Sequence, residues 1–132
     1  EKKIIIPIHP RTKSKLKVLN FKNYKNIIFT KPLKYSESIF LLSKCFFSFS
    51  DSGGIQEEAI ILRKRCLIPS DKTPHNYYIH KKANYLVNLN SKNYLNKIQL
   101  FLKLHNEKSK IKKFYHPRNV GKKIVKLINK KI

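Results

Sequence analysis

The 132-residue sequence has no Met and no Trp, and it has only three Gly, two Cys and seven acidic residues. Its length excludes collagen, coiled-coil arrays and multidomain machines, and no apolar run approaches the roughly eighteen residues that cross a bilayer. Because Met is missing even at position 1, we expect a piece of a longer protein or a processed chain. Cys45 and Cys66 lie in apolar segments without metal-ligand spacing, which predicts thiols packed in a core in a reducing compartment. We therefore expect a cytoplasmic protein with no metal site and no membrane partner.

The scarcity of acids leaves a net charge of +23, because 30 residues are Lys or Arg. Such an excess creates a field toward polyanions and raises the hypothesis of a basic RNA- or ribosome-associated protein. Only four of the basic residues are Arg, however, and Lys lacks the planar fork that reads base edges. Lys, Asn and Ile also share A/T-rich codons, so genome drift accounts for this composition. The 41% apolar content predicts a folded core, and we expect no specific nucleic-acid partner.

Apolar segments of strand length alternate with segments of helical period along the chain. This alternation predicts βαβ units, and hence an α/β fold with a doubly wound parallel sheet buried on both faces. We expect strands at residues 3–8, 26–30, 45–50, 66–68 and 85–87 and a polar loop at 69–82. The expected helices span residues 12–19, 36–43, 54–62, 95–104 and 120–128. The helical period predicts that two groups of side chains face inward: Ile39, Phe40 and Leu42, and Ile55, Ala59 and Leu62.

The turn after the third expected strand carries the most distinctive motif. Residues 51–59 read Asp-Ser-Gly-Gly-Ile-Gln-Glu-Glu-Ala. A strand, a glycine turn and a helix hold phosphate in parallel sheets, because the first N–H groups of the helix point at the anion and Gly permits close approach. The alternative is a tight connection without ligand, in which Asp51 caps the helix. Glu57 and Glu58 are expected in its first turn, where they either interact with the helix dipole or accept hydrogen bonds from a ribose diol.

Four segments together resemble, in order and spacing, the C-terminal half of the UDP-N-acetylglucosamine 2-epimerase family. They are residues 3–10, 31–35, 51–59 and 83–87, so the resemblance covers nearly the whole chain. The motif at residues 51–59 is its most specific part, and His9-Pro10 supports it independently. The resemblance implies a Rossmann-like lobe of a GT-B-like two-domain fold, with residues 1–132 forming a single nucleotide-sugar-binding lobe.

The family reaction interconverts UDP-N-acetylglucosamine and UDP-N-acetylmannosamine by elimination and re-addition of UDP, and relatives hydrolyse the sugar instead. The resemblance implies such an isomerase of polysaccharide biosynthesis, without a cofactor. It also implies that an N-terminal lobe absent from this sequence supplies the proton-transferring carboxylates, so that the chain alone is inactive, and that the full protein is a homodimer. A GT-B glycosyltransferase lobe shares the architecture and is the alternative, although the motif favours the epimerase.

Matching positions imply the contacts with a UDP-sugar. Ser52 and the N–H groups of Gly53 and Gly54 would hold the diphosphate, and Glu58 would bind the ribose hydroxyls. Main-chain groups around Leu33 would recognise uracil, with Tyr35 nearby. These positions follow the carboxyl ends of strands, where open parallel sheets bind ligands.

One segment departs from the family pattern. Family members carry Arg-x-x-Thr-Glu-Arg-Pro-Glu where residues 70–77 read Ser-Asp-Lys-Thr-Pro-His-Asn-Tyr, so Ser70 and His75 occupy arginine positions. A histidine is largely neutral at pH 7 and does not replace a bidentate guanidinium. The change indicates a different sugar, a decayed copy or an interaction taken over by Lys72. We predict His9, near the phosphates or sugar, and His75 as catalytic candidates, and we expect exposed side chains at His80, His105 and His116.

Overall fold

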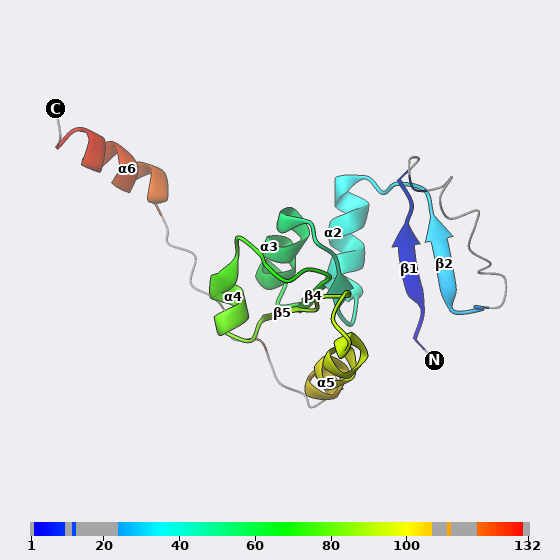
Figure 1. Cartoon of the computed structure of the whole chain (residues 1–132). Helices are drawn as coiled ribbons and strands as arrows, with labels where there is room; N and C mark the ends of the chain where they lie inside the picture. Colours follow the sequence, from blue (N-terminus) through cyan, green and yellow to red (C-terminus); the bar gives the residue numbers. More distant parts are fainter. Residues whose placement is uncertain (1, 10–11, 13–23, 107–110, 112–118, 131–132) are drawn as a thin grey trace. The chain divides into compact units, whose positions relative to one another are not determined.

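The computed structural model describes residues 2–9, 12, 24–106, 111 and 119–130. These residues belong to two compact units, Glu1–Cys45 (unit 1) and Phe46–Ile132 (unit 2). Each unit combines helices with strands, and every strand pairing among the described residues is parallel, as the sequence predicts (Figure 1).

Unit 1 contains a two-stranded parallel sheet and one helix. Strands β1 (Ile4–Pro7) and β2 (Ile27–Thr30) pair with Ile4 opposite Ile27 and Pro7 opposite Thr30. Helix α2 (Tyr35–Lys44) follows, and its first turn is fixed because the Glu37 carboxylate accepts the N–H of Lys34 at 2.7 Å. The helix expected at residues 12–19 lies outside the described residues, apart from Thr12.

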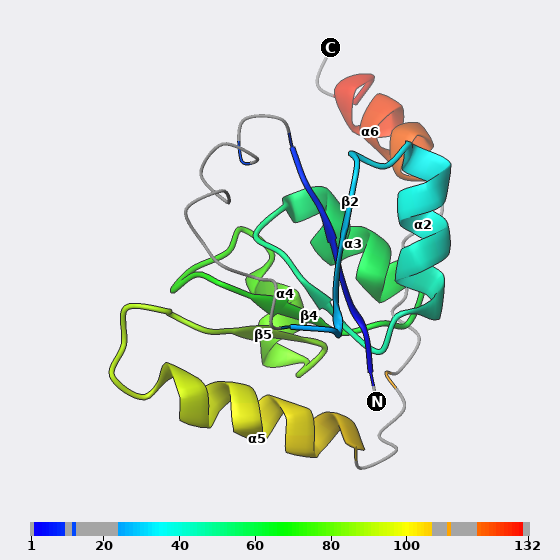
Figure 2. The ribbon, with the colours of Figure 1, turned by 90° about the vertical axis from the view of Figure 1, so that its right-hand side faces the viewer.

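Unit 2 contains a three-stranded parallel sheet in the order β3-β4-β5. Its strands are β3 (Ser48–Phe49), β4 (Cys66–Ile68) and β5 (Asn84–Leu86). Its helices are α3 (Gly53–Ile61), α4 (Asn76–His80), α5 (Tyr94–Asn106) and α6 (Val120–Ile128). Figure 2 shows α3 and α5 on opposite sides of β4 and β5. This arrangement explains why all three residues of β4 are buried.

The core of unit 2 lies between the sheet and α5. Leu67, Val87 and Phe101 are each 1% exposed and form its centre. The rings of Phe47 and Tyr85 meet Phe101 edge to face at centroid distances of 5.0 and 5.1 Å, a favourable aromatic geometry. These side chains come from β4, from β5 and the residue after it, from the segment before β3, and from α5. Their packing holds in place the sheet that carries the motif at residues 51–59.

Several sequence predictions about burial are wrong. Phe40 is exposed, while Leu42 is buried and Ile39 is half-buried. In β1, Ile4 and Ile5 are exposed, so burial on both faces holds for β4 but not for this two-stranded sheet, in which both strands are edges.

The helix after the glycines buries only one of the three residues predicted to face inward, Ala59. Its buried residues are Gln56, Ala59 and Ile60, whereas Ile55 and Leu62 are half-buried. The prediction considered only apolar residues, and the buried face includes an amide side chain.

The prediction that the side chain of His105 is exposed is also wrong, because the structure places it in a packed cluster. Its Nδ1 lies 2.9 Å from a guanidinium nitrogen of the buried Arg65, and its ring stacks on Phe101. Arg65 only donates, so Nδ1 accepts and the Nε2–H donates to the Phe46 carbonyl. The Lys-rich flanking sequence did not reveal which face of α5 this residue occupies. His80 is exposed as expected, and His116 lies outside the described residues.

Candidate nucleotide site

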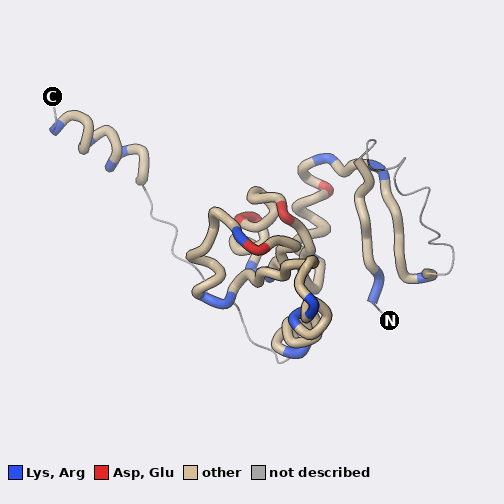
Figure 3. The backbone as a smooth tube through the Cα atoms, viewed as in Figure 1, with Lys and Arg blue, Asp and Glu red and all other residues tan. Residues whose placement is uncertain are grey.

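The carboxyl ends of parallel strands meet at one edge of a sheet, and in unit 2 this edge gathers polar residues. Strand β3 leads into the turn before α3, and β4 leads into residues 69–75 before α4. Figure 3 shows Asp and Glu segments at and near α3, whereas Lys and Arg segments lie along α5. The local charge at this edge therefore differs from the net charge of the chain.

The turn from β3 into α3 leaves the start of the helix without a side-chain cap. The Ser52 N–H donates to Ser50 Oγ at 3.2 Å, and the Ser52 carbonyl accepts the N–H of Gln56 at 3.1 Å. Ser52 is the N-cap residue, but its hydroxyl forms no capping hydrogen bond. Within the described part of the chain, no hydrogen bond takes up the N–H groups of Gly53, Gly54 and Ile55, which have no acceptor inside a helix. These three donors suit an anion.

This geometry corrects two predictions about acidic residues. Ser52, rather than Asp51, is the cap residue of α3. Because α3 begins at Gly53, Glu57 and Glu58 lie beyond its first turn. The helix dipole acts mainly within the first turn, so it gives a weaker account of these carboxylates than the sequence suggested. Glu58 is half-buried and forms no ion pair with any described residue.

Gln56 and Thr73, which the sequence analysis did not single out as functional, tie this turn to the loop after β4. The Gln56 amide donates to the Asp51 carbonyl at 3.1 Å and accepts the Thr73 hydroxyl at 2.7 Å. Thr73 Oγ1 in turn accepts the N–H of His75 at 3.2 Å. Gln56 and Thr73 are both buried. The sequence does contain a sign that Gln56 is buried. It precedes Ala59 and Ile60 by three and four residues, a spacing that puts all three on one face of a helix.

His75 lies directly against the start of α3. Its Nδ1 is 3.4 Å from Glu57 Oε1, and its side chain is 22% exposed. A Cβ atom added to Gly53 would lie 3.2 Å from His75 Nε2, which is tighter than most real contacts. The absence of a side chain at Gly53 therefore lets the histidine ring approach the helix backbone. The structure thus brings His75 against Gly53, the residue that follows Ser52.

Gly54 has no such neighbour. A Cβ atom there would meet only Ser52 Oγ, at 3.9 Å, which is an ordinary contact. No described glycine has a positive φ, so the backbone does not require Gly at this position either. Packing among the described residues does not explain Gly54, whereas close approach by a ligand would.

Tyr78 completes the group around His75. Its ring centroid is 6.2 Å from that of His75, and its N–H donates to the His75 carbonyl at 3.0 Å. Burial raises the pKa of the Tyr78 hydroxyl above its usual range, and the charge of Glu57 and the neighbouring Tyr77 contribute in the same direction. Tyr78 is therefore a neutral hydrogen-bonding group beside the histidine at physiological pH.

Ser70 and Lys72 lie in the loop that precedes His75. Ser70 is half-buried and Lys72 is exposed, and Ser70 Oγ accepts the N–H of Lys72 at 3.3 Å. The Ser70 hydroxyl thus shapes the loop.

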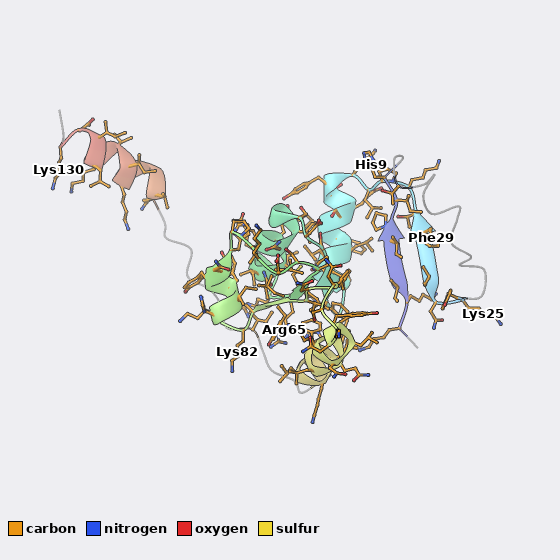
Figure 4. All side chains as sticks on the ribbon, in the orientation of Figure 1. His9, Lys25, Phe29, Arg65, Lys82 and Lys130 are labelled. Carbon is orange, nitrogen blue, oxygen red and sulfur yellow. The ribbon has the colours of Figure 1, made fainter. Side chains whose placement is uncertain are left out.

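The remaining predicted site residues lie in unit 1. His9 follows the end of β1 and is exposed, as Figure 4 shows. Leu33 follows the end of β2, so the two residues lie at the same edge of their parallel sheet. Tyr35 is the first residue of α2 and is 72% exposed. An open pocket of about 400 Å³ is lined by Leu33, Ser36, Glu37, Phe40 and Leu41.

The three parallel strand pairings and the uncapped helix start at a carboxyl edge are typical of α/β lobes that bind anions at the start of a helix. The family model described as UDP-N-acetylglucosamine 2-epimerase matches residues 1–129. The chain belongs to the UDP-N-acetylglucosamine 2-epimerase family.

Individual relatives agree with this assignment. The chain is 35% identical over 128 residues to UDP-N-acetylglucosamine 2-epimerase of Campylobacter jejuni, covering 96% of this chain and 33% of the relative. The Methanocaldococcus jannaschii enzyme of the same name is 33% identical over 132 residues, covering 97% of this chain and 35% of the relative. The chain thus spans about a third of the length of these relatives.

Solved structures give the same result and confirm the predicted fold class, a Rossmann-like lobe of a GT-B-like fold. The M. jannaschii UDP-GlcNAc 2-epimerase in complex with UDP-GlcNAc and UDP matches with a TM-score of 0.76 and 32% identity, over 98% of this chain and 36% of that one. The Neisseria meningitidis enzyme bound to UDP-GlcNAc matches with a TM-score of 0.72 and 28% identity, over 97% and 36%.

Two other features are absent from the part of the chain that the structure describes. No helix there is both long enough and apolar enough to cross a membrane. No group of three or more His, Cys, Asp and Glu side chains there is placed to hold a metal ion.

Proposed function

We propose that this chain forms the UDP-sugar-binding surface of an enzyme that interconverts UDP-N-acetylglucosamine and UDP-N-acetylmannosamine, or of a hydrolysing relative. The observation that carries the proposal is the start of α3, where three N–H groups have no acceptor among the described residues and Gly54 leaves room that packing does not use. The relatives described above are UDP-N-acetylglucosamine 2-epimerases, and one of their structures holds UDP-GlcNAc and UDP.

In this proposal the diphosphate binds to the N–H groups of Gly53 and Gly54 and to the Ser52 hydroxyl, which is not used as a cap. The Glu58 carboxylate, which has no ion pair among the described residues, accepts hydrogen bonds from the ribose hydroxyls. The pocket beside Leu33 receives uracil, with Tyr35 at its margin. His9 faces the phosphates or the sugar.

The epimerisation itself needs more than this surface. Elimination of UDP requires bases and acids around the sugar ring, together with donors for the charge that grows on the departing diphosphate. This chain supplies the donors in our proposal, and the N-terminal part of the longer relatives supplies the proton-transferring carboxylates. The chain alone then binds nucleotide without turnover, and the full protein acts as a homodimer.

The test is a titration of the chain with UDP and then ADP, followed by amide chemical shifts. We expect shifts confined to the segments around His9, Leu33 and residues 52–58, and larger for UDP. Glu58→Gln removes hydrogen bonds to a charged group, each of which contributes about 1.5–3 kcal/mol, so UDP binding weakens roughly tenfold to a hundredfold.

Ser91→Ala serves as a control, because the exposed Ser91 hydroxyl bonds only Asn93 and belongs to no proposed contact. Equal binding of UDP and ADP, or unchanged binding in Glu58→Gln, would count against the proposed function.

A further inference from the structure

The side chain of His75 is held by a carboxylate on one ring nitrogen and faces the start of α3 with the other. Glu57 Oε1 lies 3.4 Å from Nδ1, and Nε2 lies on the side of Gly53. A carboxylate beside Nδ1 favours the tautomer that carries its hydrogen on Nδ1. The neutral ring then presents a lone pair at Nε2, and only the protonated ring presents an N–H donor there.

A lone pair and a donor have opposite effects on a phosphate oxygen. The neutral ring would place an acceptor beside an acceptor, whereas the imidazolium donates a hydrogen bond and adds a positive charge at the helix start. An arginine has no such alternative, because its guanidinium is always charged. His75 therefore differs from an arginine most when its ring is neutral.

Other charged groups near this ring do not reproduce the effect. The titratable groups in contact with His75 are Glu57 from α3 and Tyr78 from α4, and Tyr78 stays neutral because its pKa is raised. The nearby turn and loop also carry exposed Asp51, Asp71 and Lys72, and none of these forms an ion pair with His75 among the described residues.

We infer that Glu57 positions His75 as a proton-dependent diphosphate ligand, so that binding of a UDP-sugar takes up one proton on His75 Nε2. The inference rests on the proposed function, since it concerns the same diphosphate site. Linkage then requires the Kd for UDP-N-acetylglucosamine to rise with pH across the range in which histidine side chains lose their proton, and to level off at the affinity of the neutral form. Glu57 is a positioning residue in this scheme, because it acts through His75.

The test measures the Kd of the 132-residue chain for UDP-N-acetylglucosamine from about pH 5.5 to 8, at constant ionic strength, where histidine titrates. This ligand is chosen because both of its phosphates are esterified, whereas the terminal phosphate of UDP titrates near pH 6, at about the second pKa of a phosphate monoester. We expect a rising Kd in the original chain, and binding measured in buffers of different ionisation heat should show net proton uptake on binding.

Three variants separate the roles of the two residues. In His75→Arg we expect tight binding and in His75→Asn weak binding. Both variants should lose the part of the pH dependence that belongs to position 75, because neither side chain titrates in this range, while His9 is the same in every variant. In Glu57→Gln the neutral ring can place its hydrogen on Nε2, so the profile flattens and binding at pH 6 weakens. Asp71→Asn removes the same charge without touching His75, and it should keep the original profile.

The outcomes distinguish this inference from the proposed function. Selective UDP-sugar binding with a flat profile in the original chain, or a pH dependence as large in His75→Arg as in the original chain, would overturn the inference and leave the proposed function standing. The absence of selective binding in both the original chain and His75→Arg at every pH would overturn both. Dispersed amide spectra of each variant would show that it is folded, and titration of the His75 ring by NMR would check its proton state directly.

Discussion

Among single residues, Gly54 is the one whose replacement should change folding stability and ligand binding in opposite directions. Its φ is not positive and an added Cβ would meet only Ser52 Oγ at 3.9 Å, so Gly54→Ala fits the folded chain. Replacing a helical glycine by alanine at a compatible site stabilises a protein by about 0.4–1 kcal/mol, mainly through the unfolded chain. We expect denaturant unfolding to show this gain, while UDP binding falls because the methyl group occupies the space of the diphosphate.

Gly53→Ala is the matched comparison for Gly54→Ala. There the Cβ would lie 3.2 Å from His75 Nε2, so the histidine ring must shift and the stability gain should be smaller or absent. A Gly54→Ala variant that bound UDP as well as the original chain would show that the glycine serves only the turn.

At the level of elements, the sequence predicted the type of nearly every described helix and strand, because the apolar periods are strong. It missed α4, since residues 69–82 are polar and contain Pro74, and a five-residue helix carries little periodic signal. It extended β3 over residues 45–50, but only Ser48 and Phe49 pair with β4. A run of apolar residues indicates which residues are buried, whereas the length of a strand depends on how many of its residues form hydrogen bonds with the neighbouring strand.

The candidate site shows the same division. The motif predicted a glycine turn that leads into a helix from about residue 54, and in the structure α3 begins at Gly53. The position of His75 beside Gly53 was not predicted and comes from the structure. The hydrogen bond between Thr73 and Gln56 could not be predicted, because Gln56 lies in the helix after β3 and Thr73 lies in the loop after β4. Period and propensity describe neighbours along the chain and say little about such long-range polar contacts.

Helix α5 fixes the sheet that carries the site, and Phe101 is its most buried residue. Phe101 is 1% exposed and its ring contacts Phe47, Tyr85 and His105. Phe101→Ala removes these contacts and leaves a cavity, which costs about 3–5 kcal/mol in comparable cores. We expect thermal unfolding, followed by circular dichroism, to show a large fall in Tm or loss of the folded state.

Leu100→Ala is the control for Phe101→Ala, because Leu100 is the preceding residue of α5 and is 58% exposed. Its effect should stay within about 0.5 kcal/mol, as for most surface substitutions. Similar losses in both variants would mean that α5 contributes through helix formation rather than through packing on the sheet.

For the whole molecule, the question is whether a net charge of +23 or the local site governs binding. Binding of a basic protein to RNA releases counterions, so its affinity falls by roughly 0.7 log units per contacted phosphate for each tenfold rise in salt. A UDP-sugar carries few charges and no condensed counterions, so its binding is weakened only by screening. We therefore expect raising the salt from about 50 to 500 mM to abolish binding of a uridine-rich RNA, while the preference for UDP over ADP persists.

Ser52→Ala makes the comparison specific to the site. It removes a proposed diphosphate contact without changing the net charge, so it should weaken UDP binding and leave RNA binding at low salt unchanged. Fluorescence anisotropy of labelled RNA and chemical shifts for the nucleotides measure the two affinities in the same buffers. RNA binding that survived 500 mM salt and required Ser52 would assign the start of α3 to nucleic acid, and the basic surface would then be part of the function rather than a consequence of composition.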